Sequence, residues 1–117
     1  MTVTSTRRVT VIMTGDIEVA DQFSAAENAD SPGAVEIKTL AIGANTITVP
    51  TGGTTVTGCT IIPPAANTSD LTLKGVSGDT GIIVHPTDPT SIALDSTVTS
   101  FVLNAEAEIV GVRLVWT

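Results

Sequence analysis

Short apolar runs, interrupted by turn-forming residues every eight to twelve positions, are the feature that most constrains how this chain can fold. The stretch from Ser69 to Leu94 shows the pattern most clearly, because a Gly-Asp-Thr-Gly sequence and a Pro-Thr-Asp-Pro sequence separate three apolar runs. Glycine allows positive φ and proline fixes φ, so both tetrapeptides favour tight turns. The stretch therefore predicts a meander of three short β-strands at 71–76, 81–85 and 91–94.

The same alternation of strand and turn extends along most of the chain. Thr and Val are the two commonest residues, and both are β-branched types that suit a pleated surface. Ten Gly and six Pro are spread among them, which argues against long helices. Further strands are predicted at 9–14, 34–42, 46–49, 54–62, 97–103 and 109–116, with turns at 15–16, 43–45, 51–53 and 95–96, a proline loop at 63–67 and an acidic bend at 104–108.

The segment 16–28 permits two interpretations. Val19 and Phe23 are four positions apart, as on one face of a helix, whereas Ile17 and Val19 alternate as in a strand. We favour an extended strand to about Phe23, followed by an Ala-rich loop through Gly33, with a short helix as the alternative.

These patterns predict an all-β fold, an antiparallel β-sandwich or jelly roll of eight to ten short strands. The 117 residues suffice for one domain, expected at 9–117. Residues 1–8 are polar and end in Arg7 and Arg8, so we expect a flexible N-terminal arm that either stays free or orders on a neighbouring subunit.

Several apolar residues have predicted places in the sandwich. Leu73, Phe101 and Leu103 are expected to point inward, and the final strand, 109–116, is apolar at almost every position, as for a strand covered on both sides. The single cysteine, Cys59, is expected to be a buried, unreactive thiol. Trp116 fits either a core position or an interface anchor.

Charge and hydropathy exclude some classes of protein. The net charge of −7 disfavours binding to nucleic acid, whose phosphates it repels. No apolar run approaches the ~18 residues of a membrane span, and the N-terminal residues lack the apolar core of a signal peptide. We therefore expect no membrane partner and synthesis in a cytoplasm.

No set of residues predicts a catalytic, cofactor or metal site, so the chain is not expected to be an enzyme. His85, the only histidine, stands between Asp79 and Asp88, but the spacing fits no metal motif. The glycines at 75–81 precede a strand, whereas a phosphate cradle needs a helix N-terminus. One histidine and no Gly-x-Ser-x-Gly sequence leave no catalytic triad.

Five stretches resemble small β-sandwich structural proteins of tailed-bacteriophage virions: Ser31-Pro32-Gly33, Gly43 to Pro50, Leu71 to Gly75, Gly78 to Ile82 and Gly111 to Trp116. The resemblance implies a virion protein made in the host cytoplasm, either a capsid decoration protein or an accessory module of the neck, tail or baseplate. Its implied partners are the major capsid protein or tail proteins, together with further copies of itself in a homo-oligomer such as a trimer. No functional residue carries over from the resemblance.

A carbohydrate-binding or receptor-binding module, using the loops 63–69 and 85–89, is the alternative function. The exposed turns around Asp79 and Thr87 supply candidate contacts for either function. The candidate interaction residues are Arg7, Arg8, Asp79, Thr87, Asp88 and Trp116.

Overall fold

The computed structural model describes the backbone of residues 5–13 and 19–27 and the complete residues 35–51 and 55–117. It confirms the predicted all-β fold, because every regular element in these ranges is a strand. The ten strands are β1 (Ser5–Met13), β2 (Val19–Glu27), β3 (Val35–Leu40), β4 (Gly43–Thr48), β5 (Gly58–Ile62), β6 (Leu71–Lys74), β7 (Ile82–Val84), β8 (Thr90–Ala93), β9 (Ser100–Ala105) and β10 (Ile109–Trp116). Across the described ranges, no helix has the length and hydropathy to cross a membrane.

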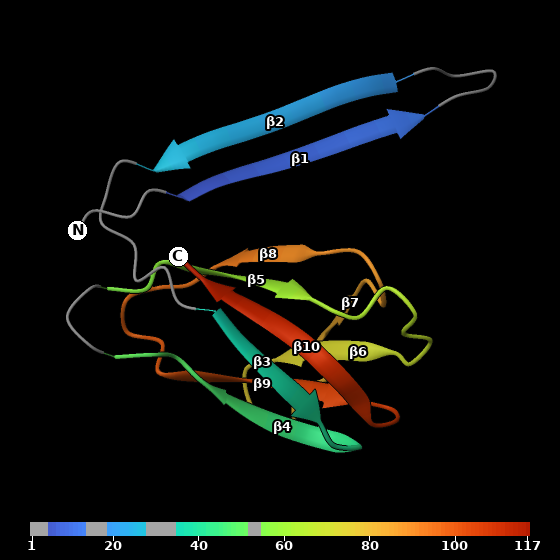
Figure 1. Cartoon of the computed structure of the whole chain (residues 1–117). Helices are drawn as coiled ribbons and strands as arrows, with labels where there is room; N and C mark the ends of the chain where they lie inside the picture. The colour runs from blue at the N-terminus through green and yellow to red at the C-terminus, as the bar shows by residue number, and fades with distance from the viewer. Residues whose placement is uncertain (1–4, 14–18, 28–34, 52–54) are drawn as a thin grey trace.

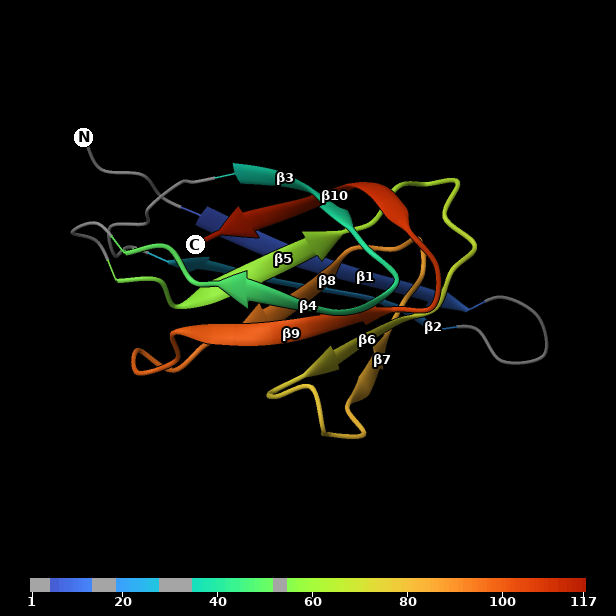
Figure 2. The same cartoon turned by 90° about the horizontal axis from the view of Figure 1, so that it is seen from below.

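Eight of the strands form two four-stranded antiparallel sheets that enclose one apolar core (Figures 1 and 2). We name each sheet after one of its inner strands. The β10 sheet has the order β3-β10-β5-β8, and the β9 sheet has the order β4-β9-β6-β7. The predicted β-sandwich is therefore present.

The strand pairing is nested. The first of these eight strands pairs with the last, and successive pairs move inward along the chain: β3 with β10, β4 with β9, β5 with β8 and β6 with β7. Two further pairings, β10 with β5 and β9 with β6, complete the sheets. The order is that of one long hairpin rolled up on itself.

The predicted three-stranded meander is wrong in its last strand. β6 and β7 form a hairpin in the β9 sheet, but β8 pairs with β5 in the other sheet. The connection at 85–89 contains Pro86 and Pro89, and proline has no N–H group with which to continue a ladder. The chain therefore passes between the sheets here.

The core consists of aliphatic side chains from both sheets and two aromatic rings. Leu71, Leu103 and Leu114 are completely buried, and Leu73 is half-buried against the same cluster. Phe101 and Leu103 point inward as predicted. Burial of this apolar area is the main source of stability in such a fold.

Strand β10 is covered on one face only, which corrects the prediction of a strand buried on both sides. Ile109, Val112 and Leu114 are buried, whereas Val110 and Arg113 are exposed. A register shift between Ile109 and Val112 inserts an extra residue beside Gly111, whose φ is +86°. A bulge of this kind re-aims the flanking side chains.

The turn between β3 and β4 lies two residues earlier than predicted. Ala41 and Ile42 form it, and the predicted turn residues 43–45 belong to β4. The side-chain Nδ2 of Asn45 donates to the carbonyl oxygens of Ala41, at 2.9 Å, and Gly43, at 3.0 Å, while its Oδ1 accepts from the Ala41 N–H at 3.0 Å. Asn45 therefore closes the turn from within the strand.

Four strands differ from their predicted ranges by up to four residues at one or both ends. The predicted strand at 54–62 is regular only from Gly58, and the predicted strand at 97–103 runs instead over β9. The strands predicted at 71–76 and 81–85 shorten to β6 and β7.

The segment before residue 35 contains a hairpin, in which β1 pairs with β2 along nine residues as a separate two-stranded sheet. β1 begins at Ser5, so residues 5–8 belong to a strand and not to a flexible arm. Arg7 pairs with Ala25, and Arg8 with Ser24. The strand interpretation of 19–23 is confirmed and the helix is wrong, although β2 continues to Glu27. Residues 1–4, 14–18 and 28–34 lie outside the described residues.

Candidate functional site

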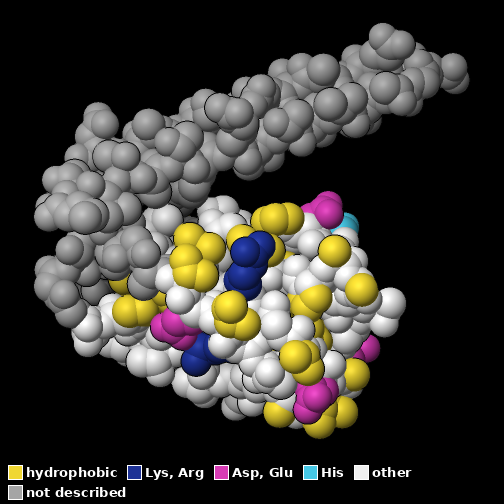
Figure 3. Space-filling view, in the orientation of Figure 1, with side chains coloured by type: hydrophobic (Ala, Val, Ile, Leu, Met, Phe, Trp, Pro, Cys, Tyr) yellow, Lys and Arg dark blue, Asp and Glu magenta, His cyan; other side chains and the backbone are white. Residues whose placement is uncertain are grey.

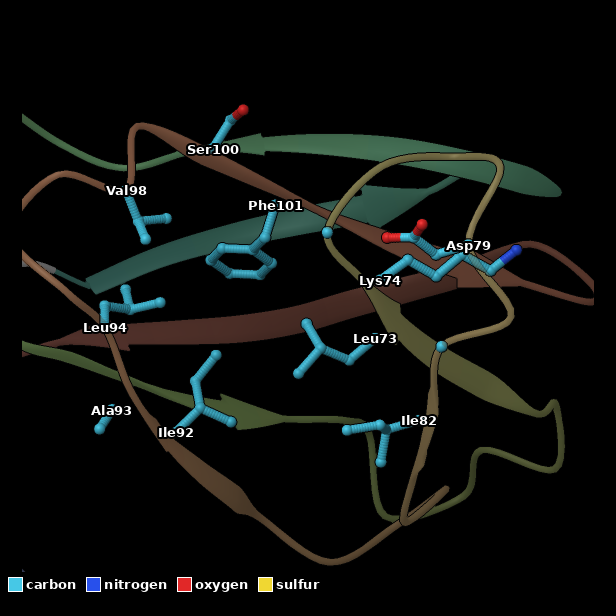
Figure 4. Close-up of a pocket in the computed structure, with 12 residues that line it drawn as sticks. Leu73, Lys74, Asp79, Ile82, Ile92, Ala93, Leu94, Val98, Ser100 and Phe101 are labelled. Carbon is cyan, nitrogen blue, oxygen red and sulfur yellow. The ribbon is translucent and has the colours of Figure 1, made fainter.

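An open groove lies at one side of the sandwich, where the edge strands β7 and β8 leave a gap between the two sheets (Figure 4). Its volume is about 660 Å³. We call it the edge groove. Its apolar lining comprises Leu73, Ile82, Ile92, Leu94, Val98 and Phe101.

Both sheets contribute to the edge groove. β6 and β9 supply Leu73 and Phe101, and β8 with the residue after it supplies Ile92 and Leu94. Leu73, Ile92 and Leu94 are half-buried and pack against the core. In Figure 4 these side chains extend into the space between the ribbons. The groove is thus a part of the core surface that the edge strands leave accessible.

The turn between β6 and β7 forms one end of the groove and contains Asp79. The carboxylate of Asp79 accepts a hydrogen bond from the Val76 N–H at 3.0 Å, and the Asp79 N–H donates to the Val76 carbonyl at 3.1 Å. Gly81 has a φ of +82°, and a Cβ added there would lie 2.6 Å from the Leu73 carbonyl oxygen. Asp79 is exposed, and its carboxylate holds the turn.

The other end of the groove adjoins the turn from Asp95 to Val98. Thr97 donates to Asp95 Oδ1 from its hydroxyl at 2.6 Å and from its N–H at 2.9 Å. The side-chain hydrogen bond, followed by the backbone one, lowers the pKa of Asp95 from the ordinary value of 3.8. Asp95 therefore keeps a negative charge beside the groove.

Thr87 and Asp88 lie in a turn that His85 organises. The Nδ1 atom of His85 accepts from the N–H groups of Asp88, at 2.9 Å, and Thr87, at 3.2 Å, and its Nε2 lies 3.6 Å from Asp88 Oδ2. The histidine is exposed. Within residues 35–51 and 55–117, no three His, Cys, Asp or Glu side chains gather as a metal site would need.

The proline loop at 63–69 contacts the loop at 85–89. The amide Nδ2 of Asn67 donates to the Pro86 carbonyl at 2.8 Å and to the Ser69 carbonyl at 3.0 Å. The Ser69 N–H in turn donates to Asn67 Oδ1 at 3.0 Å. The two loops that the sequence suggested for receptor binding therefore form one surface.

Trp116 occupies the core, so it is not available as an interface anchor. It is 0% exposed, and its indole Nε1 has no hydrogen-bond partner among the described residues. Cys59 is likewise buried, as predicted. Desolvation, with a smaller contribution from the negative charge of Glu36, raises the pKa of the Cys59 thiol from 9.0 to about 12.

Exposed apolar side chains are the functional feature that the sequence analysis missed. Ile82 and Ile83 of β7 are 72% and 74% exposed, although the sequence analysis described their segment only as an apolar strand at 81–85. Neighbouring residues of a strand point to opposite faces, so the pair Ile82-Ile83 itself signalled that one side chain faces outward. The other large exposed apolar residues are Val35, Ile37, Ile42, Val76 and Val110.

Except for Ile82, these residues add apolar area outside the edge groove. On the side shown in Figure 3, hydrophobic side chains are scattered over the sandwich with Lys and Arg side chains between them. Val35 and Ile37 belong to β3, the edge strand of the β10 sheet opposite β8. Both edges of that sheet therefore border apolar surface, which is typical of protein contact sites.

Comparison with models of known protein families, with curated protein sequences and with solved structures finds no match. The candidate site thus rests on the geometry of this chain. That geometry offers an apolar groove, two sheet edges beside it and acidic turns at its ends.

Proposed function

We propose that this chain is a non-enzymatic structural protein of a bacteriophage virion, and that it acts as a capsid decoration protein. The nested strand pairing carries the proposal. Nested pairing of eight strands, the first with the last, is the strand order expected of a jelly roll. Viral capsid and lectin domains have this architecture. Fold alone does not define function, so the surface must support the same conclusion.

The surface supports repeated contacts between proteins. Burying apolar area on association contributes roughly 25 cal/mol per Å², and Ile82, Ile83 and Ile37 supply such area at sheet edges. Copies of one chain usually associate symmetrically, so each contact recurs around the assembly. The protein would reinforce the shell by burying these side chains against the major capsid protein and against further copies of itself.

The charge supports an outward position on the particle. A net charge of −7 repels packaged DNA and is compatible with a surface that faces solvent. A protein of the neck, tail or baseplate would use the same contacts, but it would be present in fewer copies than a capsid decoration protein.

Quantitative mass spectrometry of purified particles tests the proposal. A ratio to the major capsid protein that corresponds to hundreds of copies supports decoration. A small number of copies, in multiples of three or six, would move the protein to the neck, tail or baseplate. Absence of the chain from particles would refute the virion function altogether.

Binding to a receptor or carbohydrate is a second candidate, favoured by the hydrogen bond between Asn67 and Pro86 that joins the two proline loops. A glycan array with the full chain tests it. Binding that the Asn67→Ala variant loses, while Asn104→Ala on β9 retains it, would support this function. No binding above that of an unrelated β-sandwich would exclude it for the glycans on the array.

A further inference from the structure

We propose that the edge groove of one copy receives strand β1 of a second copy, so that neighbouring subunits exchange their N-terminal hairpins. The proposal rests on the proposed function as a self-associating structural protein and specifies the contact between subunits. The inserted segment is Ser5–Met13 of one copy, and the groove between β7 and β8 of the other copy receives it.

The groove has the chemistry of a site for an extended apolar strand. Leu73, Ile92 and Phe101 line it as parts of the core that remain accessible. Side chains on one face of a strand recur every two residues, about 6.6 Å apart. The volume of the groove, about 660 Å³, falls within the range of ligand pockets, roughly 300–1,000 Å³.

Both strands that border the groove have a free edge. β7 pairs only with β6, and β8 pairs only with β5, among the strands that the structure describes. Each strand therefore offers backbone N–H and C=O groups on its outer side. Addition of a strand satisfies such groups and is a common mode of association between β-proteins. Exposed Ile82 and Ile83 on β7 would be covered at the same time.

The sequence of β1 matches this site. Val9, Val11 and Met13 occupy alternate positions, with Thr10 and Ile12 between them, so this half of the strand offers apolar residues for burial. β1 pairs with β2 and with no strand of either four-stranded sheet within the described part of the chain. One side of β1 is therefore available to a partner.

Charge complementarity also favours β1 as the strand that enters the groove. Arg7 and Arg8 are the only charged residues of β1, which gives the strand a charge of +2. Residues 35–117 carry three basic and seven acidic side chains, a net charge of −4. Asp79 lines one end of the groove next to Lys74, and Asp95 lies in the turn that adjoins the other end at Val98. An arginine of an incoming strand would therefore find a carboxylate at either end.

The exchange gives each copy one donated strand and one receiving groove. Such a contact is heterologous, because the two surfaces differ, and it closes into a ring when the rotation between copies permits. A ring of three is compatible with the trimer that the resemblance suggested. The arginines at positions 7 and 8 then act on a neighbouring subunit.

Disulfide trapping between two full-length variants tests the proposal. Val11→Cys places a thiol on β1, and Ile82→Cys places one at the groove, while the native Cys59 remains buried in both. The two proteins carry different tags, are mixed in equal amounts and are oxidised. We expect a mixed disulfide dimer, identified by mass. The matched control replaces Ile82→Cys by Val110→Cys, an exposed position on β10 outside the groove.

The yields discriminate between the outcomes. A yield of mixed dimer at least about tenfold above the control, as a preference of ~1.4 kcal/mol would give, supports strand exchange. Equal yields in both mixtures would overturn it. A double variant with both cysteines in one chain tests self-docking: if it forms mainly an intrachain disulfide at low concentration, the groove accepts its own hairpin and the exchange is refuted.

A charge placed in the groove gives an independent measurement. Ile92→Glu should weaken self-association of the full chain about tenfold or more in sedimentation equilibrium, whereas Val110→Glu should not. Circular dichroism verifies that both variants fold, and Leu94→Glu replaces Ile92→Glu if the latter does not. Unchanged self-association in a folded groove variant would contradict the exchange.

Particle binding separates this inference from the proposed function. If the chain is abundant on particles but no mixed disulfide forms, the exchange is wrong and the virion function stands. If the mixed disulfide forms but the chain is absent from particles, the exchange stands and the virion function is wrong.

Discussion

The indole ring of Trp116 packs against the phenyl ring of Phe101, with centroids 6.0 Å apart and planes inclined by 55°. Trp116 belongs to β10 and Phe101 to β9, so the pair connects the two sheets through the middle of the core. Tilted aromatic pairs of this kind contribute roughly 0.5–1.5 kcal/mol beyond the area that they bury. Phe101 also lines the edge groove, which places the groove directly against this pair.

Truncation of Trp116 should therefore strongly destabilise the sandwich. We expect Trp116→Ala to lower the free energy of unfolding by about 3–5 kcal/mol, measured by urea denaturation. Trp116→Phe should cost less, because it keeps a ring and removes the buried Nε1–H that has no partner among the described residues. Val110→Ala, at a 64% exposed position, serves as the control and should change stability by less than about 0.5 kcal/mol. Equal effects of the Trp116→Ala and Val110→Ala changes would contradict the aromatic core.

Leu71 and Leu73 occupy alternate positions on β6 but differ in accessibility, so a charge should affect them differently. Leu71 is completely buried, and Leu71→Asp should cost several kcal/mol because its carboxylate would have no solvent or partner. Leu73 is half-buried in the groove, so the carboxylate of Leu73→Asp reaches water and should cost less. Chemical denaturation of both variants gives the comparison, and a larger loss at Leu73 would show that the groove is closed in solution.

The turn between β6 and β7 should tolerate alanine at one glycine and not at another. Gly81 has a positive φ, and a Cβ there would meet the Leu73 carbonyl at 2.6 Å, so Gly81→Ala should lower the melting temperature and disturb the hairpin. Gly78 has open space around it, and Gly78→Ala should leave the melting temperature nearly unchanged. Thermal unfolding measured in parallel tests both, and similar melting temperatures would rule out the described turn.

The buried thiol should make stability depend on pH in the alkaline range. Burial raises the pKa of Cys59 from 9.0 to about 12, so above about pH 9 the unfolded chain loses this proton while the folded chain keeps it. The resulting stabilisation is complete below the unfolded pKa and is lost as pH rises toward the folded pKa. Lysines also titrate here, so the comparison is with Cys59→Ala: its free energy of unfolding should fall less between about pH 8 and pH 10 than that of the native chain. If the free energy of unfolding falls equally with pH in the native chain and in Cys59→Ala, the thiol is not desolvated.

Removal of the Thr97 hydroxyl should change the ionisation of Asp95. Thr97→Val deletes the hydrogen bond of 2.6 Å, the largest cause of the lowered pKa, so the pKa of Asp95 should rise toward its ordinary value. The lowered pKa contributes stability above the unfolded value of 3.8 that is lost as pH falls, although full exposure of the carboxyl keeps this effect small. Titration of Asp95 by nuclear magnetic resonance measures the shift, with Thr99→Val as the control that should not move it.

Local sequence was sufficient for the fold class, because alternation and turn chemistry are properties of neighbouring residues. The inward positions of Phe101 and Leu103 followed from the same alternation. The order of strands did not follow, because β3 pairs with β10 across about seventy residues and no local feature specifies that choice. Pro86 and Pro89 did signal an interruption, but not that the chain passes to the opposite sheet there.

The candidate site was less predictable than the fold for a related reason. The edge groove combines Leu73, Ile92 and Phe101, which come together only after both sheets have formed. Trp116 fitted core and surface equally well in the sequence, because its place depends on a partner in the other sheet. Arg7 and Arg8 were assigned to an arm since their segment is polar, whereas pairing with β2 extends the strand to include them.

The positions of β9 and β10 determine when the sandwich can form during synthesis. Each is an inner strand of its sheet, so neither four-stranded sheet is complete before these last strands have been made. Ribosomes add about 5–20 residues per second, so β3 and β4 wait several seconds for their partners β10 and β9. The β1–β2 hairpin needs only its own residues and can form early. The N-terminal hairpin can therefore form before the sandwich, and the receiving groove needs Phe101 of β9 before it is complete.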